Sequence, residues 1–124
     1  MSVPILKQGD VLIASIQSAL SDQDLMDLRE NFAQKIGQFR TRGVVIDVAA
    51  LDVLDSFATR TLRGIAYVGK LRGATTVVVG IQPEVAFAMV QLGLALDGIE
   101  TALDLEEGLD YLNRTARRSP RYVG

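Results

Sequence analysis

Three carboxylates and one hydroxyl lie close together in the sequence and are the side chains best placed to do chemistry. Asp47 ends an apolar run, Asp52 and Asp55 follow it, and Ser56 comes directly after Asp55. Neighbouring carboxylates can act as general acid and base or hold Mg²⁺. A serine hydroxyl can instead accept a phosphoryl group. The segment therefore offers two alternatives, carboxylate catalysis and phosphorylation.

The composition argues against catalysis. The chain has 124 residues and contains no His and no Cys. Triads with histidine, cysteine nucleophiles, His- or Cys-ligated zinc and disulfides all need residue types that are absent. Nothing near the three aspartates supplies a base tuned to neutral pH or a lysine that grips phosphate. We expect no enzyme, no catalytic residue, no metal and no cofactor.

A second pattern resembles a phosphate-binding loop. Residues 64–71 have the spacing of a P-loop, but Leu71 stands where a Mg²⁺-binding Ser or Thr belongs. A P-loop also runs from a strand into a helix, whereas Gly64 and Gly69 both fall within a helical apolar pattern. We interpret this match as a coincidence.

The charge balance gives no sign of a nucleic-acid or membrane partner. The formal net charge is −2, and 48% of the residues are hydrophobic, as in a folded domain. The N-terminus lacks the pattern of a signal peptide, and the apolar runs are shorter than a membrane-spanning helix needs. We therefore expect a cytoplasmic protein that binds neither nucleic acid nor membrane.

The apolar periodicity predicts an alternating series of strands and helices. Residues 43–48 are a β-branched run typical of a buried parallel strand. Between Leu25 and Phe39, apolar residues recur at steps of three or four, which is typical of a helix. Strands are predicted at 4–7, 11–15, 43–48, 75–79 and 99–102, and helices from 21 to near 43, at 56–71, from 83 to 93 and at 104–117. The predicted fold is α/β, with a mixed, mostly parallel sheet packed against amphipathic helices. One domain should cover residues 1–116, followed by a flexible basic tail at 117–124.

Two helices carry more specific predictions. Ser21 and Asp24 resemble a capping box, and Gly43 is the predicted stop of the same helix. Pro83 suits a first helical position. One buried face of the helix that it opens is predicted to contain Val85, Ala86, Met89, Val90 and Gly93.

Ligand sites in open parallel sheets lie beyond the carboxyl ends of the strands. This rule selects two loops, residues 49–56 and 80–84, and places Ser56 at an exposed helix start. A plainer interpretation is that Ser56 is only the N-cap of that helix.

A phosphate on Ser56 would act as a switch of surface charge. It would add about −1.5 to −2 charges and three acceptor oxygens. The helix N-terminus favours this charge and the carboxylates of Asp52 and Asp55 oppose it, so the fold should survive. Thr59 and Thr61, one turn further along, are alternative acceptors.

The order of elements, the Asp55-Ser56 step after the strand at 44–47, and the loop at 80–83 resemble the STAS domain family, the sulfate transporter and anti-sigma factor antagonist family. The resemblance runs from about Ile5 to Asn113. Residues 53–57, 70–74 and 80–83 are together most similar to its stressosome scaffold branch, the RsbS type.

The resemblance implies a non-enzymatic scaffold that forms large homo- and hetero-oligomers with RsbR-type STAS paralogues. It implies that the scaffold sequesters an RsbT-type serine kinase until that kinase phosphorylates Ser56, and that a cognate phosphatase resets the state. Asp52, Asp55 and Thr59 would support the switch loop, with Asp55 as the cap of the helix, and Phe57, Gln82, Pro83 and Glu84 would meet partners.

Two other functions stay open. The first is an anti-anti-sigma factor that binds a serine-kinase anti-sigma factor, although members of that type commonly read Ser-Ser-Gly-Leu where this chain has Phe57 after Ser56. RsbR-type paralogues carry a sensor domain before their STAS domain. The segment before Ile5 is too short for such a domain, which favours the scaffold type. The second is a structural subunit in which Ser56 only caps a helix.

Overall fold

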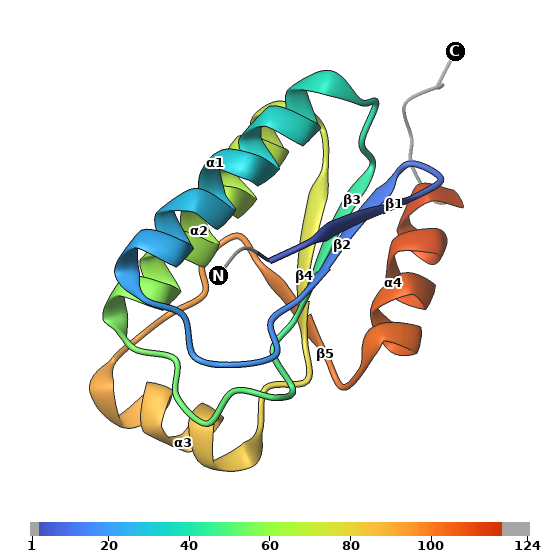
Figure 1. Ribbon diagram of the computed structural model, residues 1–124. Helices are drawn as coiled ribbons and strands as arrows, with labels where there is room; N and C mark the ends of the chain where they lie inside the picture. The colour runs from blue at the N-terminus through green and yellow to red at the C-terminus, as the bar shows by residue number, and fades with distance from the viewer. Residues whose placement is uncertain (1–2, 118–124) are drawn as a thin grey trace.

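The protein is a five-stranded sheet with helices on both faces and a further helix at one end (Figure 1). A computed structural model describes residues 3–117. Its elements are β1 (Ile5–Gln8), β2 (Val11–Ser15), α1 (Asp22–Gln38), β3 (Gly43–Asp47), α2 (Ser56–Leu71), β4 (Thr75–Val79), α3 (Pro83–Leu92), β5 (Glu100–Ala102) and α4 (Leu105–Arg117).

The strands lie in the order β1-β2-β3-β4-β5. The short turn at Gly9 makes β1 antiparallel to β2, and every later neighbour is parallel because a helix returns the chain across the sheet. Ile46 is thus paired between Ala14 and Val78, all of them buried. The predicted α/β class and the mixed, mostly parallel sheet are confirmed.

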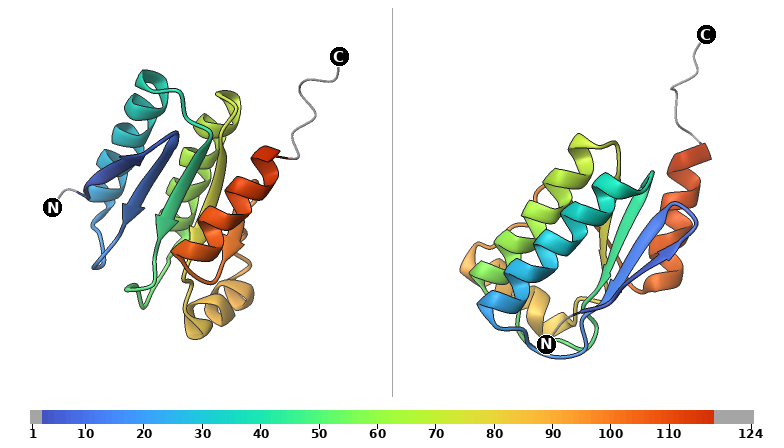
Figure 2. Two further views of the ribbon diagram at one scale, coloured as in Figure 1. Left: turned by 90° about the vertical axis from the view of Figure 1, so that its right-hand side faces the viewer. Right: turned by 45° about the horizontal axis from the view of Figure 1, so that its top comes forward.

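The two faces of the sheet carry different helices. Helices α1 and α2 lie side by side on one face, α4 lies alone on the other, and α3 covers the end where the parallel strands finish (Figure 2). Phe32 and Leu62 fill the core under α1 and α2, and Leu112 of α4 closes the opposite layer. All three are almost fully buried.

Helix α1 begins where the sequence predicts, but it does not end where predicted. The Ser21 hydroxyl accepts from the Asp24 amide at 3.1 Å, and the Asp24 carboxylate accepts from the Ser21 amide at 3.2 Å, which confirms the capping box. The predicted stop near Gly43 is wrong. Phe39 turns to an extended conformation and packs on the core, so the helix ends at Gln38.

The predicted buried face of α3 is wrong in part. Val85 and Met89 are buried, whereas Ala86 and Val90 are exposed, and Gly93 is the exposed left-handed C-cap. The reason is that α3 lies across the end of the sheet (Figure 1), where only Val85 and Met89 of the helix are buried. This leaves Val90 78% exposed.

One arginine joins distant parts of the chain. The Arg42 Nε donates to both carboxylate oxygens of Asp10 at 3.1 Å, and its Nη1 donates to the Leu112 carbonyl at 2.9 Å. The hydrogen bonding from Arg42 to the Asp10 carboxylate and the positive charge of Arg42 lower the pKa of Asp10 below its usual value. The hairpin, the start of β3 and the end of α4 are held together by this contact.

No helix in residues 3–117 is both long and apolar enough to cross a membrane. Arg117 is the last residue of α4. The rest of the predicted basic tail, residues 118–124, lies outside the described part of the chain.

Candidate functional site

The two loops selected from the sequence meet at the carboxyl edge of the sheet. The Gln82 Nε2 donates to the Ala49 carbonyl at 2.8 Å. Gly80 has a φ of +83°, and a Cβ placed on it would lie 2.8 Å from the Cβ of Ala49. The loop at 80–82 therefore packs against the start of the loop at 48–55, which makes one continuous surface.

The three aspartates do not converge. The Asp47 carboxylate accepts from the Ala49 amide at 2.9 Å and shapes the turn after β3. Asp52 is exposed, and Asp55 is occupied at the start of α2. Residues 3–117 contain no cluster of three or more acidic side chains that could hold a metal ion. Asp47 and Asp55 are thus each engaged with the backbone of their own loop or helix start.

Asp55, not Ser56, is the N-cap of α2. Its Oδ1 accepts from the Ala58 amide at 2.8 Å, and its carbonyl accepts from the Thr59 hydroxyl at 2.8 Å. Ser56 is the first residue of the helix and is exposed, and its hydroxyl makes no hydrogen bond within residues 3–117. The interpretation of Ser56 as a helix cap is therefore wrong, and its hydroxyl is accessible.

The alternative acceptors are not accessible. Thr59 and Thr61 are 0% and 2% exposed, and their hydroxyls donate to the carbonyls of Asp55 and Phe57. Both hydroxyls are instead engaged with backbone carbonyls of the first turns of α2. Ser56 is the one exposed hydroxyl in this first part of the helix, residues 56–61.

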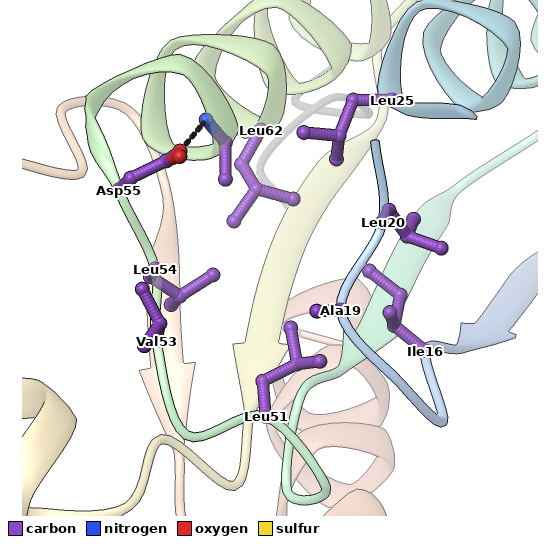
Figure 3. A pocket seen from close by; sticks show the side chains of 10 residues that line it. Ile16, Ala19, Leu20, Leu25, Leu51, Val53, Leu54, Asp55 and Leu62 are labelled. Carbon is purple, nitrogen blue, oxygen red and sulfur yellow. Dashed lines mark hydrogen bonds between the residues drawn. The ribbon is translucent and has the colours of Figure 1, made fainter. Parts of the chain in front are cut away.

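An apolar pocket lies beside the start of α2 (Figure 3). Its volume is about 80 Å³. Its wall includes the exposed Val53, the buried Leu54 and the capping residue Asp55. The other side comes from the connection between β2 and α1, namely Ile16, Ala19 and Leu20. The apolar residues of the 49–56 loop were a signal for this pocket, but only the fold shows its second wall.

The remaining predicted partner residues are spread along the same edge. Phe57 is half-buried against the core, with the Arg60 guanidinium 5.7 Å from its ring centre. Gln82 is half-buried because its amide holds Ala49, while Pro83 and Glu84 are exposed at the start of α3.

Fold and site together define a small α/β domain with an exposed serine at a helix N-terminus beyond its central strand. The chain matches the STAS domain family over residues 2–108. It belongs to that family.

Two solved structures are especially similar. A variant of Moorella thermoacetica RsbS in which glutamate replaces a serine is 40% identical, with a TM-score of 0.81 over 93% of this chain and 97% of that one. A chain from the stressosome, described as a signal integration and transduction hub, is 41% identical, with a TM-score of 0.78 over 92% and 99%.

A longer relative is the RsbT co-antagonist protein RsbRA of Bacillus subtilis, 23% identical over 110 residues. The alignment covers 88% of this chain but only 40% of that protein. The anti-sigma factor antagonist SpoIIAA shares the fold, at 15% identity and a TM-score of 0.74.

Proposed function

We propose that this protein is a non-enzymatic scaffold of a stressosome, which assembles with RsbR-type STAS paralogues and holds an RsbT-type serine kinase until Ser56 is phosphorylated. The proposal is supported by about 40% identity to RsbS and to a stressosome chain over nearly their whole lengths. It is also supported by the likeness to RsbRA, the RsbT co-antagonist.

The observation that carries the switch is the geometry of Ser56. Its hydroxyl is exposed and unbonded within residues 3–117, while Asp55 already caps the helix. A phosphate can therefore be added without breaking a hydrogen bond of the fold. It would change the charge of the surface and leave the scaffold in place, which is what a binding switch requires.

The neighbouring features give the kinase a surface to recognise. Asp52 adds exposed negative charge next to the acceptor, and the pocket under Val53 and Asp55 can receive one apolar side chain. The edge formed by Gln82, Pro83 and Glu84 extends the same surface. The proposed cycle needs a kinase that uses ATP and a phosphatase that resets Ser56. We therefore propose a cytoplasmic location for it.

The testing experiment incubates the protein with an RsbT-type kinase and ATP, maps the phosphosite by mass spectrometry and measures kinase retention on a sizing column. We expect phosphate on Ser56, retention of the kinase by Ser56→Ala, and its release by Ser56→Asp. The matched control is Gln8→Asp, because Gln8 is exposed at the end of β1 beside the start of β2, away from this edge, and receives the same charge. That variant should retain the kinase.

An unmodified Ser56, together with wild-type retention by both Ser56 variants, would refute the switch. The size of the complex with an RsbR-type paralogue separates the alternatives. A scaffold should form particles of roughly megadalton size, whereas an anti-anti-sigma factor should stay small with its anti-sigma kinase.

A further inference from the structure

A cavity lies at the end of α2 opposite Ser56, beside the last turn of α1. Its volume is about 320 Å³. The two helices end side by side there (Figures 1 and 2). We term this cavity the helix-end cleft, and its wall includes Ile36, Phe39, Arg40, Thr41 and Arg72.

The sheet brings the two arginines of the cleft to the same place. Arg40 lies in the connection from α1 to β3, and Arg72 is the C-cap of α2, just before β4. Strands β3 and β4 are parallel neighbours, and the Thr75 amide donates to the Arg42 carbonyl at 3.0 Å. The two connections therefore lie next to each other, and each contributes one arginine to the wall of the cleft.

Neither of these arginines has an acidic partner in residues 3–117. Arg40 and Arg72 are exposed, and their guanidinium groups make no hydrogen bond or ion pair with the described part of the chain. Arg42 and Arg114, by contrast, are each paired with an aspartate. Residues 31–46 and 56–83, which include the whole wall of the cleft, contain no Asp or Glu. The cleft therefore has positive charge without a counter-charge in its own wall.

Two lysines add to this positive charge. The Nζ atoms of Lys7 and Lys35 lie 5.4 Å and 6.0 Å from the centre of the Phe39 ring, which lines the cleft. The C-terminal ends of α1 and α2 oppose the charge, but each is equivalent to only about −0.5 of an elementary charge. The cationic side chains outweigh the helix ends, so the cleft attracts anions.

We propose that the helix-end cleft binds the phosphate group of a small phosphorylated molecule, at a site separate from the switch at Ser56. A phosphate monoester carries about −1.5 to −2 charges at neutral pH, which matches two arginines better than the single charge of a carboxylate. Each guanidinium can donate two parallel hydrogen bonds to phosphate oxygens.

The size and the apolar part of the cleft favour an ester over the free phosphate ion. A volume of about 320 Å³ lies within the range of small-molecule sites, roughly 300–1,000 Å³. Ile36 and Phe39 contribute apolar atoms to the wall beside the arginines. The carbon skeleton of an ester can contact these atoms while its phosphate contacts the guanidinium groups.

NMR titration of the ¹⁵N-labelled chain with phenyl phosphate, at an ionic strength held near about 0.1 M, tests the proposal. We expect saturable shifts of the Thr41 and Gly73 amides, which lie in the two connections at the cleft. The Gly80 amide should not shift, because it follows β4 at the opposite edge of the sheet.

Arg40→Gln and Arg72→Gln should each weaken the binding of phenyl phosphate about tenfold or more, because each removes hydrogen bonds to a charged group. The matched control is Arg60→Gln, which loses the same charge at the other end of α2, where Arg60 lies over the Phe57 ring. It should bind like the wild type. The amide spectra of the variants verify that they are folded.

Arg72→Lys separates a specific contact from general attraction. It keeps the positive charge but loses the planar pair of donors, so it should bind more weakly than the wild type and more tightly than Arg72→Gln. A parallel titration with inorganic phosphate identifies the source of the phosphate group. We expect phenyl phosphate to bind more tightly, because only the ester reaches the apolar side of the cleft.

An absence of saturable shifts at about 10 mM phenyl phosphate, or an equal loss of affinity in Arg60→Gln, would overturn the proposal. Equal or tighter binding of inorganic phosphate would overturn the ester in favour of the free ion. These measurements contain no kinase and leave Ser56 unchanged, so their failure is separate from a failure of the phosphorylation switch.

Discussion

At the scale of single residues, Asp55 and Ser56 have different roles in the site. Asp55 provides the carboxylate that caps α2, so Ser56 is left with an exposed hydroxyl that the fold does not use. Had Ser56 been the cap, its phosphorylation would have removed a hydrogen bond worth on the order of 1 kcal/mol. Because Asp55 caps the helix, Ser56 can be phosphorylated without losing that hydrogen bond.

Arg60 is expected to respond to the modification. It lies four residues after Ser56, so the two side chains share one face of α2, and its guanidinium now rests 5.7 Å from the Phe57 ring centre. We expect phosphorylated Ser56 to attract Arg60 from that ring. The positive charge should lower the second pKa of the phosphate, ordinarily near 6, by a few tenths of a unit.

Phosphorus NMR titration of the phosphorylated protein measures this pKa. In Arg60→Gln the phosphate pKa should rise relative to the wild type, whereas in Lys70→Gln, which is on the same face but more than three turns from Ser56, it should not change. Equal phosphate pKa values in the wild type and Arg60→Gln would show that no such pair forms.

At the scale of elements, the site depends on how closely two loops approach. Gly80 makes the approach possible in two ways: its positive φ turns the chain out of β4, and its missing Cβ leaves room for the backbone and Cβ of Ala49. The Gln82 amide then fixes the contact through the Ala49 carbonyl. The two loops are therefore joined at the end of this surface nearest the sheet.

Gly80→Ala should lower the free energy of unfolding by about 2–4 kcal/mol, because it combines a left-handed backbone with a collision against Ala49. Gly98→Ala is the matched control. Gly98 has a φ of +79° but no atom within 4 Å of an added Cβ, so it should lose only about 1 kcal/mol. Urea unfolding of the two variants measures the difference. Equal losses would mean that the loops separate easily.

At the scale of the whole molecule, Arg42 connects the first hairpin to the last helix. Its contacts with Asp10 and the Leu112 carbonyl join segments that are 32 and 70 residues away in sequence. Helix α4 lies alone on its face of the sheet, so this contact adds to the packing of Leu112 in holding it there. Both ends of the described chain are thereby attached to the same core.

The contact between Asp10 and Arg42 should make the free energy of unfolding depend on pH. Hydrogen bonding to Arg42 lowers the pKa of Asp10 from its ordinary value of 3.8, so the folded state favours the charged carboxylate. The resulting stabilisation is present above pH 4 and is lost as the pH falls through the lowered pKa of the folded state.

Asp10→Asn should therefore be less stable than the wild type at pH 7 and should lose less of its stability between about pH 4 and pH 2. Thermal unfolding across this range measures both effects. Asp52→Asn, at an exposed aspartate for which no ion pair is found in residues 3–117, is the control and should follow the wild type. Parallel pH profiles for the wild type and Asp10→Asn would contradict the prediction.

Local sequence patterns were enough to predict the elements and their order. Apolar periodicity and β-branched runs report local burial, so they predicted the strands, the helices and the capping box at Ser21. The position of Ser56 at a helix start beyond a buried strand was predicted in the same way. The resemblance carried by the segments near Ser56 and Gln82 indicated the family, which the comparisons confirmed.

The folded chain was needed to show which polar groups are accessible and which distant segments are in contact. Asp55 and Ser56 are both good capping residues, and only the backbone path shows that Asp55 takes the role. Periodicity likewise overestimated the buried face of α3, because it cannot show that the helix crosses the end of the sheet. The pocket beside Asp55 arises from contacts between residues far apart in sequence, which no local pattern records.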